Sequence, residues 1–131
     1  MKRNLVLVIE SDADILHLVT MILEDANFDV IGMIQPPELD IDIDPEVIIL
    51  DIGPNNLRNQ DFYKKLQTHK KTSNIPVLLT STFNGLKKTA QQWNAYGFFE
   101  KPFDVHHLVN EVSRAIVYPN ASRSNVLQEL S

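Results

Sequence analysis

The sequence predicts an α/β protein built on one doubly wound, five-stranded parallel sheet. Short runs of apolar, often β-branched residues recur along the chain, and each is short enough for a strand buried on both faces. Amphipathic segments with helical spacing separate most of these runs. Strands that alternate with helices indicate a parallel sheet, and right-handed crossovers then place helices on both of its faces.

Five strands and four helices are expected in order. The predicted strands cover residues 5–9, 28–34, 47–50, 76–80 and 98–99. The first helix should begin after Asp12, a good N-cap residue, and end near Asn27. The remaining helices are expected over residues 60–69, 86–96 and 104–117, and Pro119 should stop the last of them.

Residues 35–44 interrupt this alternation. Pro36 and Pro37 are followed by alternating acidic residues and isoleucines, which disfavour a long helix. We therefore expect a second helix of the fold to be shortened to at most one turn, within an acidic surface loop.

Composition narrows the possible functions. A chain of 131 residues with 44% hydrophobic residues fits one compact domain, expected over residues 4–118, with 119–131 as a polar tail or the start of a linker. The net charge of −5 argues against nucleic-acid binding, which needs clustered Lys and Arg. The absence of cysteine excludes disulfides and thiolate metal sites. No signal peptide or membrane span is recognisable, so we expect a cytoplasmic protein.

Polar residues follow several predicted strands. Ligands of open α/β sheets bind beyond the carboxyl ends of the strands, where the strand order switches. A carboxylate there can attack a phosphoryl group, and oxygen ligands can hold the Mg²⁺ that neutralises the developing charge. The residues expected at this edge are Glu10, Ser11, Asp12, Asp51, Ser81, Thr82 and Lys101.

These features resemble the receiver domain of two-component response regulators. The resemblance covers about residues 4–117 and is carried by four motifs in order. They are the acidic cluster 9–15, the strand 45–51 that ends in Asp51, the segment from Pro76 to Thr82, and Phe99-Glu100-Lys101-Pro102-Phe103. The resemblance implies a flavodoxin-like fold with Asp51 as phosphoacceptor.

The resemblance also implies roles for other residues. Lys101 would pair with the phosphoryl group, Ser81 would be the switch hydroxyl and Phe98 the switch aromatic. Glu10, Asp51 and the backbone carbonyl of Gly53 would hold Mg²⁺. Lys101-Pro102 would be a cis peptide, which is accessible at an X-Pro bond.

The chain departs from the family pattern at three places. Ser11 stands where the family has the acid that binds the metal directly, and Asp12 is an alternative ligand that competes with its role as a helix cap. Asn55 replaces a proline and Asn59 a glycine in the segment after Asp51.

The expected function is a phosphorylation-dependent switch rather than an enzyme. A histidine kinase or phosphotransfer protein would donate the phosphoryl group, and helix 86–96, strand 98–99 and helix 104–117 would bind an output partner. A phosphorylation-independent pseudo-receiver, favoured by Ser11, is the main alternative. A flavodoxin-like cofactor binder is disfavoured, because no Gly- or Ser/Thr-rich phosphate loop follows the first strand.

Overall fold

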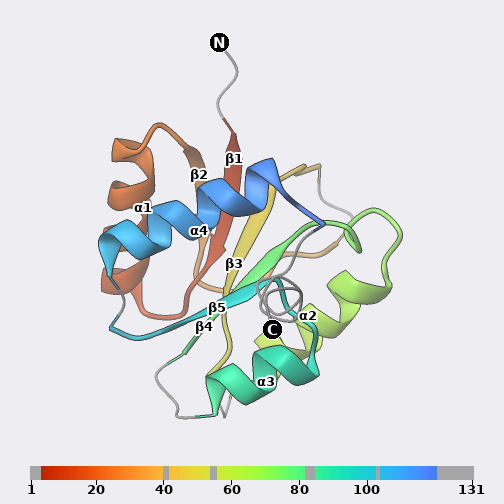
Figure 1. Ribbon diagram of the computed structural model, residues 1–131. Helices are drawn as coiled ribbons and strands as arrows, with labels where there is room; N and C mark the ends of the chain where they lie inside the picture. Colours follow the sequence, from red (N-terminus) through yellow and green to blue (C-terminus); the bar gives the residue numbers. More distant parts are fainter. Residues whose placement is uncertain (1–3, 40–41, 54–55, 82–84, 103, 121–131) are drawn as a thin grey trace, which may run out of the picture.

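A five-stranded parallel sheet forms the centre of the protein, with strands in the order β2-β1-β3-β4-β5 (Figure 1). The computed structural model describes residues 4–39, 42–53, 56–81, 85–102 and 104–120. Its strands are β1 (Leu5–Ile9), β2 (Asp29–Met33), β3 (Val47–Asp51), β4 (Val77–Ser81) and β5 (Gly97–Glu100). The predicted fold class is confirmed, including the parallel pairing of every neighbouring strand.

The three central strands are buried along nearly their whole length because both of their faces are covered. All five residues of β3 are buried, including Asp51 at its end. The strand order reverses direction at β1, which has β2 on one side and β3 on the other. The carboxyl ends of β1 and β3 therefore form the topological switch point at which such sheets bind ligands.

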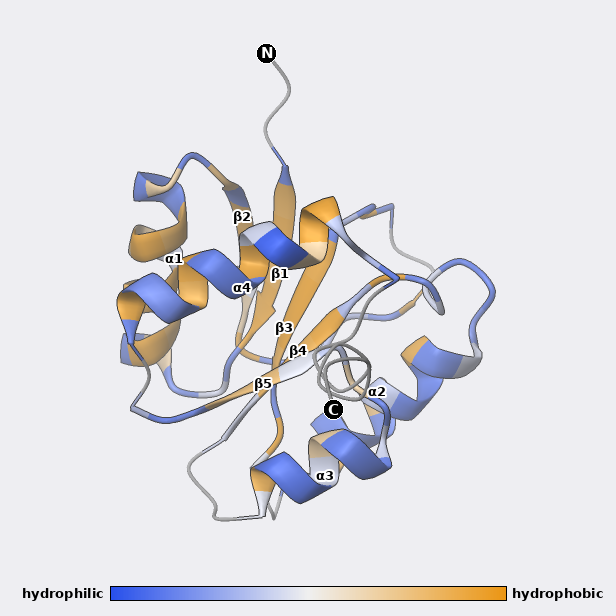
Figure 2. Cartoon of the chain, viewed as in Figure 1, coloured by the Kyte–Doolittle hydropathy of each residue, from blue (hydrophilic) through white to orange (hydrophobic). Residues whose placement is uncertain are grey.

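Four helices cover the sheet in the described part of the chain. They are α1 (Ala13–Asp25), α2 (Leu57–Thr68), α3 (Leu86–Gln92) and α4 (Val105–Val117). The apolar residues of α1 and α4 pack on one face, and those of α2 and α3 pack on the other. Figure 2 shows mostly hydrophobic strands at the centre and helices that carry both hydrophilic and hydrophobic residues. Within the described ranges, no helix is both long and apolar enough to cross a membrane.

Capping residues explain where the helices begin and end. Asp12 caps α1 as predicted, and its side chain accepts hydrogen bonds from the backbone N–H groups of Asp14 and Ile15. The second predicted helix begins earlier than residue 60, because Asn56 caps α2 and accepts from the backbone N–H of Asn59. Helix α3 ends at Gln92 rather than near Tyr96, and Asn94 follows with a left-handed φ of 55° that does not continue a helix.

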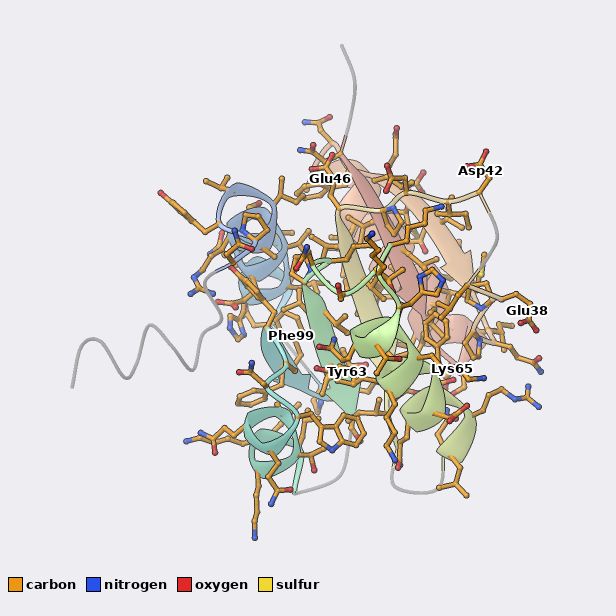
Figure 3. All side chains as sticks on the ribbon, turned by 90° about the vertical axis from the view of Figure 1, so that its right-hand side faces the viewer. Glu38, Asp42, Glu46, Tyr63, Lys65 and Phe99 are labelled. Atoms are coloured by element: carbon orange, nitrogen blue, oxygen red, sulfur yellow. The ribbon has the colours of Figure 1, made fainter. Side chains whose placement is uncertain are left out.

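The connection between β2 and β3 contains no helix in its described residues, 34–39 and 42–46. The helix that Pro36 and Pro37 were predicted to shorten to at most one turn is absent from those residues. Figure 3 shows Glu38 and Asp42 pointing away from the sheet, as expected for an acidic surface loop. The apolar side chains of the connection instead line a small hollow of about 30 Å³ against the sheet and α2; its walls include Pro37, Leu39, Ile43, Leu7 and Phe62.

Candidate functional site

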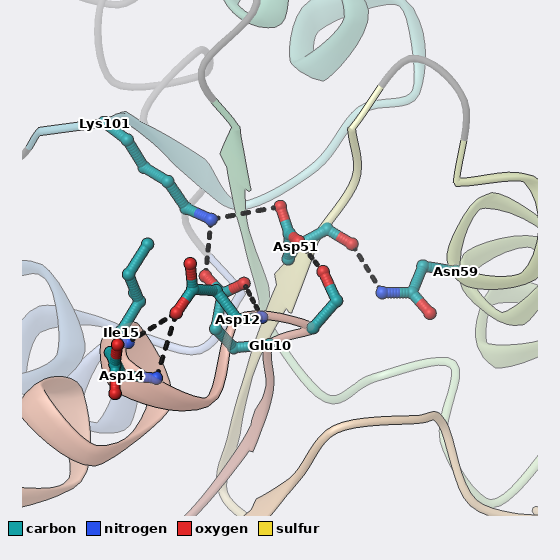
Figure 4. A network of polar contacts seen from close by, with 8 residues as sticks. Glu10, Asp12, Asp14, Ile15, Asp51, Asn59 and Lys101 are labelled. Atoms are coloured by element: carbon teal, nitrogen blue, oxygen red, sulfur yellow. Dashed lines mark hydrogen bonds and ion pairs between the residues drawn. The ribbon is translucent and has the colours of Figure 1, made fainter.

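Three charged side chains meet at the switch point of the sheet (Figure 4). Glu10 directly follows β1, Asp51 ends β3 and Lys101 directly follows β5. The Nζ atom of Lys101 lies 2.5 Å from Oε1 of Glu10 and 3.3 Å from Oδ1 of Asp51. The three side chains are at most 10% exposed, so this is a largely buried set of ion pairs.

The backbone fixes Lys101 at this edge. Its N–H donates to the backbone carbonyl of Ser81 at 2.9 Å, so the segment after β5 stays beside the end of β4. The Lys101-Pro102 peptide bond is cis, as the sequence indicated. The side chain therefore approaches Glu10 and Asp51 from the strand that lies beyond β4.

Burial raises the pKa of Glu10 above its usual value. Hydrogen bonds from Lys101 and from the backbone N–H of Asp12 act in the opposite direction, whereas the neighbouring Asp51 carboxylate raises the pKa further. The Asp12 N–H lies 3.1 Å from Oε2 of Glu10, so both carboxylate oxygens of Glu10 have a donor.

Ser11 contacts the predicted phosphoacceptor directly. Its hydroxyl donates to Oδ2 of Asp51 at 2.8 Å. Since Lys101 contacts Oδ1, both carboxylate oxygens of Asp51 are engaged by groups of the protein. A neutral hydroxyl donor thus occupies the position at which receiver domains have an acid, as the resemblance indicated.

Two amide side chains on the first turn of α2 hold the segment that follows Asp51. Asn59 is buried, and its Nδ2 donates to the backbone carbonyl of Asp51 at 2.7 Å. The carbonyl of Gly53 accepts hydrogen bonds from the backbone N–H of Asn56 at 3.0 Å and from Nε2 of Gln60 at 3.1 Å. The sequence reasoning did not find these amide contacts, although Asn59 had been noted as a departure from the family pattern.

The remaining predicted site residues differ in their positions and in their burial. Asp12 is exposed and uses its carboxylate to cap α1. Ser81 is buried at the end of β4, and the strand register places Thr80 directly beside Asp51. Phe98 is half-buried and packs with the α2 and α3 side of the core. Thr82 lies outside the described residues.

The chain is similar in sequence to two known regulators. No protein-family model matches the chain. RpaA of Synechocystis, a DNA-binding transcriptional regulator, is 28% identical over 112 residues, which are 82% of this chain and 46% of RpaA. Rrf1 of Nitratidesulfovibrio vulgaris is 28% identical over 120 residues, which are 85% of this chain and 81% of Rrf1. The chain thus spans about half the length of RpaA but most of Rrf1.

Solved structures share the fold. The chemotaxis protein CheY4 of Vibrio cholerae has a TM-score of 0.75 at 22% identity, with 86% of this chain and 98% of CheY4 covered. A response regulator receiver protein from Burkholderia phymatum has a TM-score of 0.73 at 16% identity, with 88% and 96% covered. The fold is that of response-regulator receiver domains. This fold brings Glu10, Asp51 and Lys101 together, as the motifs predicted.

The oxygen donors of this receiver do not fit the predicted magnesium site as they are arranged here. Within the described residues, no three His, Asp or Glu side chains are grouped to hold a metal ion. The two lone pairs of the Gly53 carbonyl already accept two hydrogen bonds, and Ser11 brings no charge. Two carboxylates and one ammonium sum to −1, so a divalent ion would leave these groups at +1. An acid in place of Ser11 would make that sum zero.

Proposed function

We propose that this receiver domain is a signalling module that works through protein contacts, without magnesium-dependent phosphorylation of Asp51. The observation that carries the proposal is the 2.8 Å hydrogen bond from the Ser11 hydroxyl to Asp51. This bond and the Lys101 contact give the unmodified carboxylate two protein partners. Such pairing supports one stable arrangement of the site in the absence of any modification.

Charge balance also supports the proposal. Transfer of a phosphoryl group would replace the single charge of Asp51 with about two negative charges. Glu10 would add a third, and among the described residues at the site Lys101 supplies the opposing positive charge. Phosphoryl transfer relies on positive charge placed where negative charge develops. The described site therefore has little positive charge to stabilise this reaction.

A phosphorylation-dependent switch is the second candidate. It is favoured by the contact between Lys101 and Asp51 and by the position of Ser81 at the end of the adjacent strand. In this mechanism an oxygen of Asp51 attacks the phosphorus of a phosphohistidine, the P–N bond breaks, and its electron pair returns to the imidazole. A sensor histidine kinase or a phosphotransfer protein would be the donor. Repacking of Ser81 and Phe98 would then signal the change.

Both candidates place the output partner on the face formed by α3, β5 and α4. In both, the domain would turn over no substrate, would act in the cytoplasm, and would leave any contact with nucleic acid to another protein or domain. The net charge of −5 supports the last point.

Phosphoryl donors test the two candidates against each other. The whole chain and its Asp51→Asn variant would be incubated with phosphoramidate, with and without Mg²⁺, and analysed by intact-mass spectrometry. We expect neither protein to gain a phosphoryl group. A Mg²⁺-dependent gain in the wild type that Asp51→Asn abolishes would establish the switch and overturn the interaction-module proposal.

A further inference from the structure

Two polar side chains outside the predicted acceptor occupy the atoms that a cation would need. Ser11, in the turn between β1 and α1, donates to the Asp51 carboxylate at 2.8 Å. Gln60, on the first turn of α2, donates to the Gly53 carbonyl at 3.1 Å. The two contacts come from different elements of the chain, since Ser11 precedes α1 and Gln60 belongs to α2.

Lys101 is the third side chain of this arrangement, and its ammonium group supplies a positive charge. Lys101 lies between the Glu10 and Asp51 carboxylates and contacts an oxygen of each. A monovalent ammonium with three N–H donors satisfies two carboxylates without the near-octahedral shell that Mg²⁺ requires. The hydroxyl of Ser11 and the amide of Gln60 complete this arrangement with neutral donors.

We infer that Ser11 and Gln60 are positioning residues that hold the Asp51 site in a form without a divalent ion, in which the Lys101 ammonium is the cation. This inference deepens the proposed function and rests on it for its role in signalling. It predicts that divalent binding is recoverable. An acid at position 11 adds a charged ligand and removes a donor, and loss of the Gln60 amide releases one lone pair of the Gly53 carbonyl.

Titration calorimetry with MgCl₂ tests the inference on the full chain. We expect the wild type to show no saturable heat. The dissociation constant of Ser11→Asp for Mg²⁺ should be at least about tenfold lower than the lower bound measured for the wild type, because a charged ligand increases the affinity for a divalent ion. Adding Gln60→Ala to Ser11→Asp should tighten Mg²⁺ binding by a further factor of roughly ten, because Gln60 donates a hydrogen bond to the Gly53 carbonyl, a predicted ligand atom. Ser11→Glu provides a second acidic variant if Ser11→Asp fails to fold.

Two controls separate a local effect from a general one. Ser73→Asp adds the same charge at an exposed position near the opposite end of β4, and Ser11→Ala removes the hydroxyl without adding charge. Neither should gain Mg²⁺ binding. The inference is overturned if the wild type binds Mg²⁺ within about threefold of the acidic variants, or if Ser73→Asp gains as much as Ser11→Asp.

The outcome is independent of the phosphorylation test. A wild type that gains a phosphoryl group on Asp51 equally with and without Mg²⁺, and shows no Mg²⁺ heat, would overturn the proposed function and leave the inference standing. A wild type that binds Mg²⁺ yet accepts no phosphoryl group would do the reverse.

Discussion

Lys101 lies nearer to Glu10 than to any other charged group named at the site, with 2.5 Å between Nζ and Oε1. Each of these two side chains is at least nine-tenths buried. Removing one member of a buried ion pair leaves the other without compensation, and this costs more than the pair itself contributes. We therefore expect this pair to contribute to the stability of the domain as well as to the site at the edge of the sheet.

Replacing Lys101 with methionine should lower the free energy of unfolding by about 3 kcal/mol, because Glu10 and Asp51 would face each other without a cation. Urea unfolding followed by circular dichroism would measure the loss. Lys65→Met is the matched control, since Lys65 pairs with Asp61 at 3.2 Å on an exposed helix surface and should change stability by less than about 1 kcal/mol. Equal losses in the two variants would show that burial does not distinguish the pairs.

Replacing Asn59 with alanine should destabilise the domain by about 1–2 kcal/mol, because the carbonyl of Asp51 would lose its 2.7 Å hydrogen bond in a buried setting. Asn110→Ala, at an exposed position of α4, serves as the control and should be near neutral. Denaturant unfolding of both variants checks the prediction, and a loss confined to Asn110→Ala would contradict it.

Alkaline pH should destabilise the domain through Tyr63. Burial raises the pKa of this phenol from 10.0 to about 12. The folded state therefore keeps a proton that the unfolded state releases between these values, and stability falls as pH rises through this window. Urea unfolding between about pH 9 and 12, which spans this window, should show a steeper decline in stability for the wild type than for Tyr63→Phe. Tyr118→Phe, at an exposed position, should keep the wild-type slope.

The sequence predicted the elements whose signals are local. Runs of apolar residues predict all five strands. Asp12 is predicted as a helix cap because it directly precedes a segment with apolar residues at helical spacing. Asp51 and Lys101 were placed together because parallel strands end at one edge of the sheet. These predictions needed no knowledge of how loops fold.

The contacts of Asn59 and Gln60 could not be read from the sequence. A polar residue on the first turn of a helix is usually solvated, and only the path of the chain after Asp51 turns these amides toward backbone carbonyls. The start of α2 was missed for a related reason, since Asn56 was one of several turn-forming residues that could have served as its cap.

The connection after β2, which has no helix over residues 34–39 and 42–46, leaves β2 at the edge of the sheet. β2 is an edge strand, bonded along its length to β1 alone. Its last residue, Met33, accepts a hydrogen bond from the backbone N–H of Glu10 at 3.0 Å. An edge strand has a hydrogen-bonded neighbour on one side only, and local opening of a fold requires such hydrogen bonds to break. A local opening of β2 would therefore release the backbone N–H of Glu10, the ion-pair partner of Lys101, while β3 and β4 remain paired.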